Sequence, residues 1–218
     1  MIGWEIVKMT KEFITETLNY YFPTPDCELH YKHDYELLLS VMLSAQTTDK
    51  RVNEVMDPIF KKYNTLEKLD KLSIKELENM LKSIGFYHNK AKNFKGIVTK
   101  LKEKGFVPND RDYLESLPGV GRKTANVVLG ELYNEPVIAV DTHVSRVSKR
   151  LGIAKLNDDV SVIEKKLMKK FDKETWNKLH LQLVLFGRYR CKAVAPLCDG
   201  CKFYNDCKKI KADKKCKK

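Results

Sequence analysis

Four cysteines stand close together near the C-terminus of this 218-residue chain and constrain its fold more than any other feature. Their spacing is C-x6-C-x2-C-x5-C, at Cys191, Cys198, Cys201 and Cys207. Zinc ribbons usually pair two C-x2-C knuckles across a longer spacer, whereas this pattern contains one C-x2-C. A compact wrap of four thiolates suits a cubic iron–sulfur cluster, whose corners lie a few ångströms apart. The spacing therefore favours an iron–sulfur loop over residues 191–207, with a structural zinc as the alternative.

The rest of the sequence indicates a reducing compartment and no membrane span. Many cysteines in a secreted chain would suggest disulfides, but the N-terminal residues mix Lys and Glu into their apolar positions and do not resemble a secretory signal. No apolar run is long enough to cross a bilayer. These features predict a cytoplasmic protein, or a nuclear one if the cell is eukaryotic.

The chain is basic, with 41 Lys and Arg against 29 Asp and Glu and a formal net charge of +12. An excess of this size favours a polyanionic partner such as nucleic acid. The tail at residues 208–218 carries seven Lys and one Asp and so supplies +6 of the excess. Such a tail adds salt-sensitive attraction to phosphates without reading sequence, so charge alone does not establish DNA binding.

Helical periodicity runs through the chain, and strand patterns are almost absent. Ser73 and Glu76 form a capping-box pattern at the start of one helical segment. Residues 136–140 look extended but are too short to seed a sheet. We therefore predict an all-α protein of about ten helices. Apolar residues recur at helical spacing at Phe13, Ile14, Leu18, at Leu77, Met80, Leu81, Ile84, and at Ala125, Val128, Leu129, Leu132.

Pro- and Gly-containing breaks divide the chain into two predicted lobes. A helical-barrel lobe is expected over residues 28–134, with a helical hairpin at about 112–133. The second lobe combines residues 1–27 with 135–218. It would contain the N-terminal helix, the cysteine loop and the basic tail.

The segment Leu117-Pro118-Gly119-Val120-Gly121 is predicted to form the turn of the hairpin. Pro118 ends the first helix, and the two glycines allow backbone angles and close approach that a side chain would prevent. N–H groups at the start of the second helix would face a phosphate oxygen, which the helix dipole favours. A plain connecting turn is the alternative, because a lone G-x-G pattern is weak.

Lys123 lies in the first turn of the helix that follows, where a surface cation is mildly unfavourable. The same positive environment favours the neutral amine, which is the nucleophilic form. The pattern therefore suggests an amine that attacks the C1′ atom of a sugar and forms a Schiff base. Asp141 is the matching carboxylate, and because it precedes a helical run it also fits an N-cap. His143 fits a polar first-turn residue better than a catalyst.

Four motifs in this order resemble the endonuclease III family, which belongs to the helix-hairpin-helix base-excision DNA glycosylases. They are L-S-A-Q-T-T-D at 43–49, L-P-G-V-G-R-K-T-A at 117–125, V-D-T-H at 140–143 and the four-cysteine pattern. The resemblance extends over nearly the whole chain. It implies two all-α lobes with a DNA-binding cleft between them. It also implies a four-iron, four-sulfur cluster (4Fe-4S) held by Cys191, Cys198, Cys201 and Cys207.

The resemblance implies roles for single residues as well. Lys123 matches the nucleophile of the bifunctional members, and Asp141 matches its activator. Gln46 matches the residue that fills the gap left by an extruded nucleotide, and Phe86 falls where relatives often place a leucine wedge. The further expected DNA contacts are Gly119, Val120, Gly121, Arg122 and His143.

The implied activity is that of a bifunctional DNA glycosylase and abasic-site (AP) lyase. Such an enzyme removes damaged pyrimidines through a lysine Schiff base and then cleaves the strand 3′ to the site by β-elimination. Its expected partner is duplex DNA with a damaged base or an abasic site, its expected active form is a monomer, and its expected location is the nucleoid.

Three alternatives stay open at this point. A monofunctional glycosylase for G/T or A/G mismatches would release a base and leave the strand intact, although such relatives generally lack the lysine matched by Lys123. A non-catalytic helix-hairpin-helix module would bind DNA without releasing a base. An iron–sulfur electron carrier would show reversible redox activity without processing a lesion.

Overall fold

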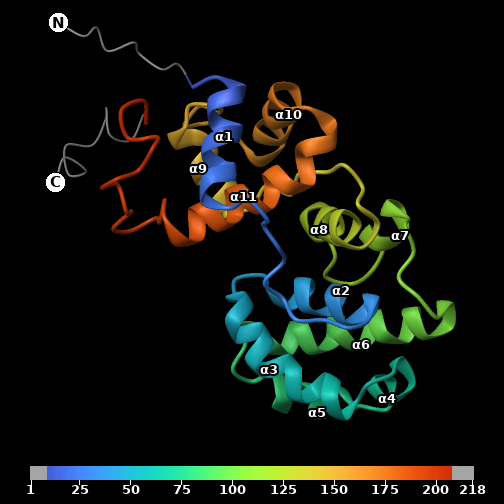
Figure 1. Cartoon of the computed structure of the whole chain (residues 1–218). Helices are drawn as coiled ribbons and strands as arrows, with labels where there is room; N and C mark the ends of the chain where they lie inside the picture. Colours follow the sequence, from blue (N-terminus) through green and yellow to red (C-terminus); the bar gives the residue numbers. More distant parts are fainter. Residues whose placement is uncertain (1–8, 208–218) are drawn as a thin grey trace, which may run out of the picture. The chain divides into compact units, whose positions relative to one another are not determined.

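The computed structural model describes residues 9–207; residues 1–8 and the predicted basic tail at 208–218, with Cys216, lie outside the described residues. The described residues form eleven α-helices and one 3-10 helix, and no strand occurs among them (Figure 1). The all-α prediction is therefore confirmed. No helix in this part of the chain combines the length and apolar character that a membrane span requires.

The helices are α1 (Lys11–Tyr21), α2 (Asp34–Leu43), α3 (Asp49–Lys62), α4 (Leu66–Asp70), α5 (Ile74–Leu81), α6 (Tyr87–Lys104), α7 (Arg111–Glu115), α8 (Arg122–Tyr133), α9 (Thr142–Arg150), α10 (Val160–Lys170), the 3-10 helix η1 (Lys173–Thr175) and α11 (Trp176–Tyr189).

The chain divides into two compact units. The contiguous unit is Cys27–Glu135, and the discontinuous unit combines Met1–Asp26 with Pro136–Lys218. The contiguous unit holds α2 to α8. The described part of the discontinuous unit holds α1, α9, α10, η1 and α11.

The core of the contiguous unit is built on α2 and α6. The sequence of α2, DYELLLSVML, is mostly apolar, and residues 35–43 are all buried. A helix that is apolar all round must be covered by neighbours, and α3, α6 and α8 pack against it. On α6 the buried residues recur at helical spacing, at Lys90, Phe94, Ile97 and Leu101. The helices α4 and α5 pack on α6 (Figure 1).

The predicted capping box at the start of α5 is confirmed. The Ser73 hydroxyl accepts a hydrogen bond from the N–H of Glu76. The Glu76 carboxylate in turn accepts one from the N–H of Ser73 at 2.8 Å. Two N–H groups that the helix start would otherwise leave unpaired are thus satisfied by neighbouring side chains.

Side chains from both ends of the described chain form the core of the discontinuous unit. Leu18 of α1 is fully buried together with Val147 of α9 and Phe186 of α11. The helix α11 packs against both α1 and α9, and it buries Leu183 and Phe186 in this core. Because α11 ends just before Cys191, this core holds the start of the cysteine loop.

Candidate active site

The predicted hairpin forms in the contiguous unit, between α7 and α8. Gly119 in its turn has a φ of +76°, a left-handed conformation that favours glycine. A Cβ atom at this position would also collide with the side-chain amide of Asn93 on α6. Gly119 therefore meets two requirements of the turn, a backbone conformation and a close approach to α6.

Gly121 is the N-cap of α8 and meets a different requirement. A Cβ atom there would have nothing within 4 Å. Gly121 provides no capping side chain, and the first turn of α8 contains no acidic residue. Arg122 and Lys123 in that turn are both exposed. The start of α8 is therefore an open, electropositive surface of the kind that binds phosphate, and it presents the amine of Lys123.

Val120 lies in the core, unlike the other residues of the turn predicted to contact DNA. Its side chain is buried in the core of the contiguous unit. Its N–H donates a hydrogen bond to the carbonyl of Leu117 at 3.1 Å. Side chain and N–H are thus both used inside the protein. Val120 therefore anchors the turn between two exposed glycines, and the DNA contact expected of it stays a prediction.

Asp141 is the N-cap of α9, which confirms one of the two roles predicted for it. Its Oδ1 accepts a hydrogen bond from the N–H of Val144 at 2.7 Å, and the residue is half-buried. Its negative charge lies at the positive end of α9, where the helix dipole is favourable. Lys123 belongs to the contiguous unit and Asp141 to the discontinuous unit.

His143 is fixed by Arg146, one turn further along α9. The Nη2 atom of Arg146 donates to Nδ1 of His143 at 3.2 Å and to the carbonyl of Gly187 at 2.8 Å. Because Nδ1 accepts, the neutral ring carries its proton on Nε2. A Cβ atom on Gly187 would lie 2.9 Å from the Cβ of His143, so this glycine lets α9 and α11 approach closely. His143 is therefore held as an oriented N–H donor.

Gln46 and Phe86 share an unusual backbone conformation. Both are non-glycine residues in the left-handed region, with φ of +56° and +59°. Gln46 is exposed between α2 and α3, and Phe86 is the N-cap of α6 with 66% of its surface exposed. Such a conformation costs on the order of 1–3 kcal/mol and persists only where the surrounding structure imposes it. The contiguous unit thus presents both predicted probes of the base stack in strained turns.

All four predicted cysteine ligands line one pocket of the discontinuous unit, and none of them forms a disulfide. The loop folds on local hydrogen bonds, from the N–H of Cys201 to the carbonyl of Cys198 at 3.1 Å and from the N–H of Cys207 to the carbonyl of Phe203 at 2.9 Å. Phe203 is buried and packs edge-on against Phe186, with ring centroids 5.4 Å apart. This contact anchors the loop to the core of the unit.

Two arginines of α9 hold the start of this loop, and sequence reasoning missed both of them. Arg150 Nη1 donates to Sγ of Cys191 at 3.2 Å and to the carbonyl of Lys192 at 2.7 Å. Arg146 Nε donates to the carbonyl of Cys191 at 3.0 Å. Burial raises the pKa of the Cys191 thiol, and the nearby Arg150 acts in the opposite direction. The arginines lie 41 and 45 residues before Cys191, so no local pattern links them to it.

The pocket supplies the donor chemistry of an iron–sulfur site. Four sulfur atoms are the usual ligand set of such clusters, and Arg150 and Arg190 line the same pocket and offset part of the thiolate charge. Among the described residues, no three His, Cys, Asp or Glu side chains are close enough to bind one metal ion.

Comparison with known proteins places these features in one family. The family model described as HhH-GPD superfamily base excision DNA repair protein matches residues 39–173. The chain is 47% identical over 207 residues to endonuclease III of Bacillus subtilis (strain 168), and the match covers 94% of each chain.

Two solved structures combine the same fold with similar identity. One is described as a trapped endonuclease III–DNA covalent intermediate; it has a TM-score of 0.87 and 46% identity, covering 93% of this chain and 98% of the other. The second is a non-covalent endonuclease III–DNA complex, with a TM-score of 0.89 and 45% identity over 94% and 99% of the two chains. Identity at this level over almost the full length of both chains extends well beyond a shared fold.

Proposed function

The chain belongs to the endonuclease III family of HhH-GPD base excision DNA repair proteins, and we propose on that premise that Lys123 is the nucleophile of a DNA glycosylase and abasic-site lyase. One observation carries this proposal. A protein 46% identical to this chain has been trapped in a covalent intermediate with DNA, and Lys123 presents an amine from the open, electropositive start of α8. A covalent intermediate requires a nucleophile, and an amine beside a phosphate-binding surface meets that need.

DNA binding is assigned to groups of both units. The hairpin turn at Gly119 and Gly121 and the exposed Arg122 contact a phosphate at the start of α8, where the helix dipole favours an anion. His143, held by Arg146, donates from Nε2. Gln46 and Phe86 occupy the space that the damaged nucleotide leaves when it rotates out of the stack.

The reaction proceeds through an imine between Lys123 and the sugar. The lone pair of Nζ forms a bond to C1′, and the C1′–N bond to the damaged base breaks, with the electron pair leaving on the base. The nitrogen now bound to C1′ loses one proton, and the C1′–O4′ bond breaks with its electron pair going to O4′, which takes up a proton. A protonated Schiff base remains. Removal of a proton from C2′ expels the 3′ phosphate, so the strand is cut on the 3′ side of the lesion by β-elimination.

Asp141 is the proposed carboxylate of this reaction. One carboxylate oxygen, Oδ1, caps α9, and the second oxygen of the group serves the substrate. A carboxylate placed where positive charge develops on the sugar stabilises that charge and assists the proton transfers. The cap fixes the orientation of the group before DNA binds.

A four-iron, four-sulfur cluster is the proposed occupant of the cysteine pocket, with Cys191, Cys198, Cys201 and Cys207 as ligands. The four thiols in one pocket and the hydrogen bond from Arg150 to Sγ of Cys191 support this assignment. When bound, the cluster would fix the shape of the 191–207 loop. The chemistry on DNA is carried by Lys123 and Asp141.

The cluster assignment is tested by exchanging single cysteines. Cys198→Ser is expected to lower the iron and acid-labile sulfide bound per chain to less than half of the wild-type value, because serine is a poor ligand for such a cluster. It should also expose the 191–207 loop to proteolysis. Cys27→Ser is the matched control, since Cys27 belongs to the contiguous unit, forms no disulfide and does not line the cysteine pocket. Equal iron and sulfide contents in both variants would contradict the assignment.

The function is tested with a panel of duplexes that carry an oxidised pyrimidine, an abasic site, a G/T mismatch, an A/G mismatch or no damage. Base release and strand cleavage are measured separately on each. We expect both products from the oxidised pyrimidine and cleavage at the abasic site. Release without cleavage would indicate a monofunctional mismatch glycosylase, and binding without either product would indicate a non-catalytic module. The partner in this proposal is damaged duplex DNA, the active unit a monomer, and the location the cytoplasmic nucleoid.

A further inference from the structure

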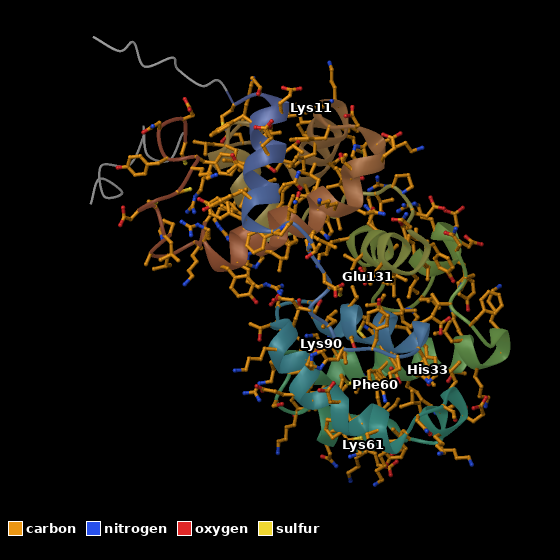
Figure 2. The ribbon with its side chains drawn as sticks, in the orientation of Figure 1. Lys11, His33, Phe60, Lys61, Lys90 and Glu131 are labelled. Atoms are coloured by element: carbon orange, nitrogen blue, oxygen red, sulfur yellow. The ribbon has the colours of Figure 1, made fainter. Side chains whose placement is uncertain are left out.

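Lys90 is a buried lysine whose ammonium group holds the turn that carries Gln46. Lys90 lies on α6, and its side chain is 5% exposed in the contiguous unit (Figure 2). Its Nζ donates to the carbonyl of Leu43 at 2.9 Å, to the carbonyl of Ala45 at 2.6 Å and to Oγ1 of Thr47 at 3.0 Å. An ammonium group has three N–H donors, so every one of them is matched by an acceptor in this turn.

These three acceptors, and not the filling of space, explain why a lysine occupies this buried position. Burial lowers the pKa of Lys90, which means that the protonated form is disfavoured by its loss of water. A methionine would fill a similar space without that penalty. Leu43 is the last residue of α2, however, and the negative end of a helix is a favourable place for a cation.

The acceptors of Lys90 lie on both sides of Gln46 in the sequence. Ala45 provides one and Thr47 provides another, while Gln46 between them has a φ of +56° and an exposed side chain. A non-glycine residue keeps this conformation only where its neighbours are held firmly. Hydrogen bonds from one cation to both neighbours provide that restraint and leave the glutamine side chain free to point outward.

The backbone of Lys90 is tied to Phe86 as well. The N–H of Lys90 donates to the carbonyl of Phe86 at 3.1 Å, one turn earlier on the same helix. Phe86 has the same left-handed backbone and is exposed. A single residue therefore connects the turn that presents Gln46 to the turn that presents Phe86.

We propose that Lys90 is a positioning residue for nucleotide extrusion, which fixes Gln46 relative to Phe86 so that both enter the base stack together. This inference rests on the proposed glycosylase function and extends it to a residue that touches neither DNA nor the reacting atoms. Its consequence is selective. Loss of the Lys90 charge impairs the release of a well-stacked, paired lesion more than the release of a lesion that is already poorly held, because the latter needs less help to leave the stack.

The test measures base release in a single turnover on two duplexes. One carries an oxidised pyrimidine opposite its normal partner base, and the second carries the same lesion opposite an abasic site. Lys90→Met is expected to slow release from the first duplex about 10- to 100-fold, the scale of a small misplacement of binding groups. The rate on the second duplex should change less than threefold. A 2-aminopurine placed opposite the lesion reports unstacking on binding, and its fluorescence rise should shrink in the variant.

Lys95→Met is the matched control. Lys95 lies on the same helix and also holds a turn, since its Nζ donates to Oδ1 of Asp70 at 3.0 Å and to the carbonyl of the same residue. It has no bond to the turn of Gln46 in the described structure, so we expect lower thermal stability and wild-type rates on both duplexes. If Lys90→Met does not fold, Thr47→Val removes one acceptor without touching the core and should slow release from the paired duplex about threefold or more.

Each outcome decides the inference. Selective loss on the paired duplex in Lys90→Met or Thr47→Val, with Lys95→Met unchanged, supports it. Wild-type rates on the paired duplex in both variants, or equal losses on the two duplexes, overturn it. Failure of the proposed function is separate, because it shows as absence of base release by the wild-type protein. The 2-aminopurine signal reports unstacking on binding and does not require base release. It therefore tests the role of Lys90 even if the wild-type protein releases no base.

Discussion

Lys123→Gln is expected to lose strand cleavage and Schiff-base formation, with a fall in single-turnover rate of at least ~10³-fold, the scale seen when an enzyme loses its nucleophile. Glutamine has a similar length and stays polar, so the exposed start of α8 should fold as in the wild type. The loss would therefore be chemical. The measurements are the rate of nicking of an abasic-site duplex and covalent trapping of the protein on damaged DNA with borohydride.

Lys123→Arg separates the nucleophile from its charge. A guanidinium group stays protonated and attracts phosphate at least as well as an ammonium group, but it does not attack C1′. We therefore expect near wild-type affinity for damaged duplex, no borohydride adduct and no nicking. Nicking at wild-type rates by either variant would place the nucleophile elsewhere, and an arginine variant that restores cleavage would reduce Lys123 to a phosphate contact.

Asp141→Asn is expected to lose about 10²- to 10³-fold in turnover while the protein stays folded. Asparagine caps helices about as well as aspartate, so its side-chain oxygen should still accept the hydrogen bond from the N–H of Val144. The free energy of unfolding should change by less than about 0.5 kcal/mol. This variant is therefore expected to lose activity without losing stability. Asp141→Ala, by comparison, removes both charge and cap and should also cost about 1 kcal/mol of stability.

Asp159→Asn is a matched control in the same unit. Asp159 is the N-cap of α10, and its Oδ1 accepts from the N–H of Val162 at 2.9 Å. The substitution removes the same charge from the same kind of position, and wild-type turnover is the expected result. Thermal unfolding and single-turnover nicking are measured on both variants. Equal activity of Asp141→Asn and Asp159→Asn would mean that Asp141 is a helix cap and nothing more.

The features that could be predicted from the sequence were those that depend on residues close together in the chain. The capping box of Ser73 and the cap of Asp141 each depend on side chains within one turn of a helix. The cysteine ligands were predicted for the same reason, because their spacing limits how the loop can wrap. Lys123 was proposed as the nucleophile from its place behind the hairpin motif, and that role stays a prediction.

Contacts between distant segments could not be predicted in this way. Val120 sits in a glycine-rich turn that suggests exposure, yet the packing of the contiguous unit buries it. The bond from Arg150 to Cys191 depends on the packing of α9 against α11. Both contacts depend on how several helices pack together to bury their apolar side chains. A short stretch of sequence does not contain that information.

Lys90 shows where the two kinds of information meet. Its spacing with Phe94, Ile97 and Leu101 already places it on the apolar face of α6, so the sequence by itself determined that this lysine would lose water. Only the tertiary structure decided what it would gain, because the carbonyls at the end of α2 lie more than forty residues earlier in the chain. Local hydrogen bonding and periodicity set each helix and its caps. The packing of one helix on another then determined that the ammonium group of Lys90 holds the turn of Gln46, while Lys123 stays exposed at the start of α8.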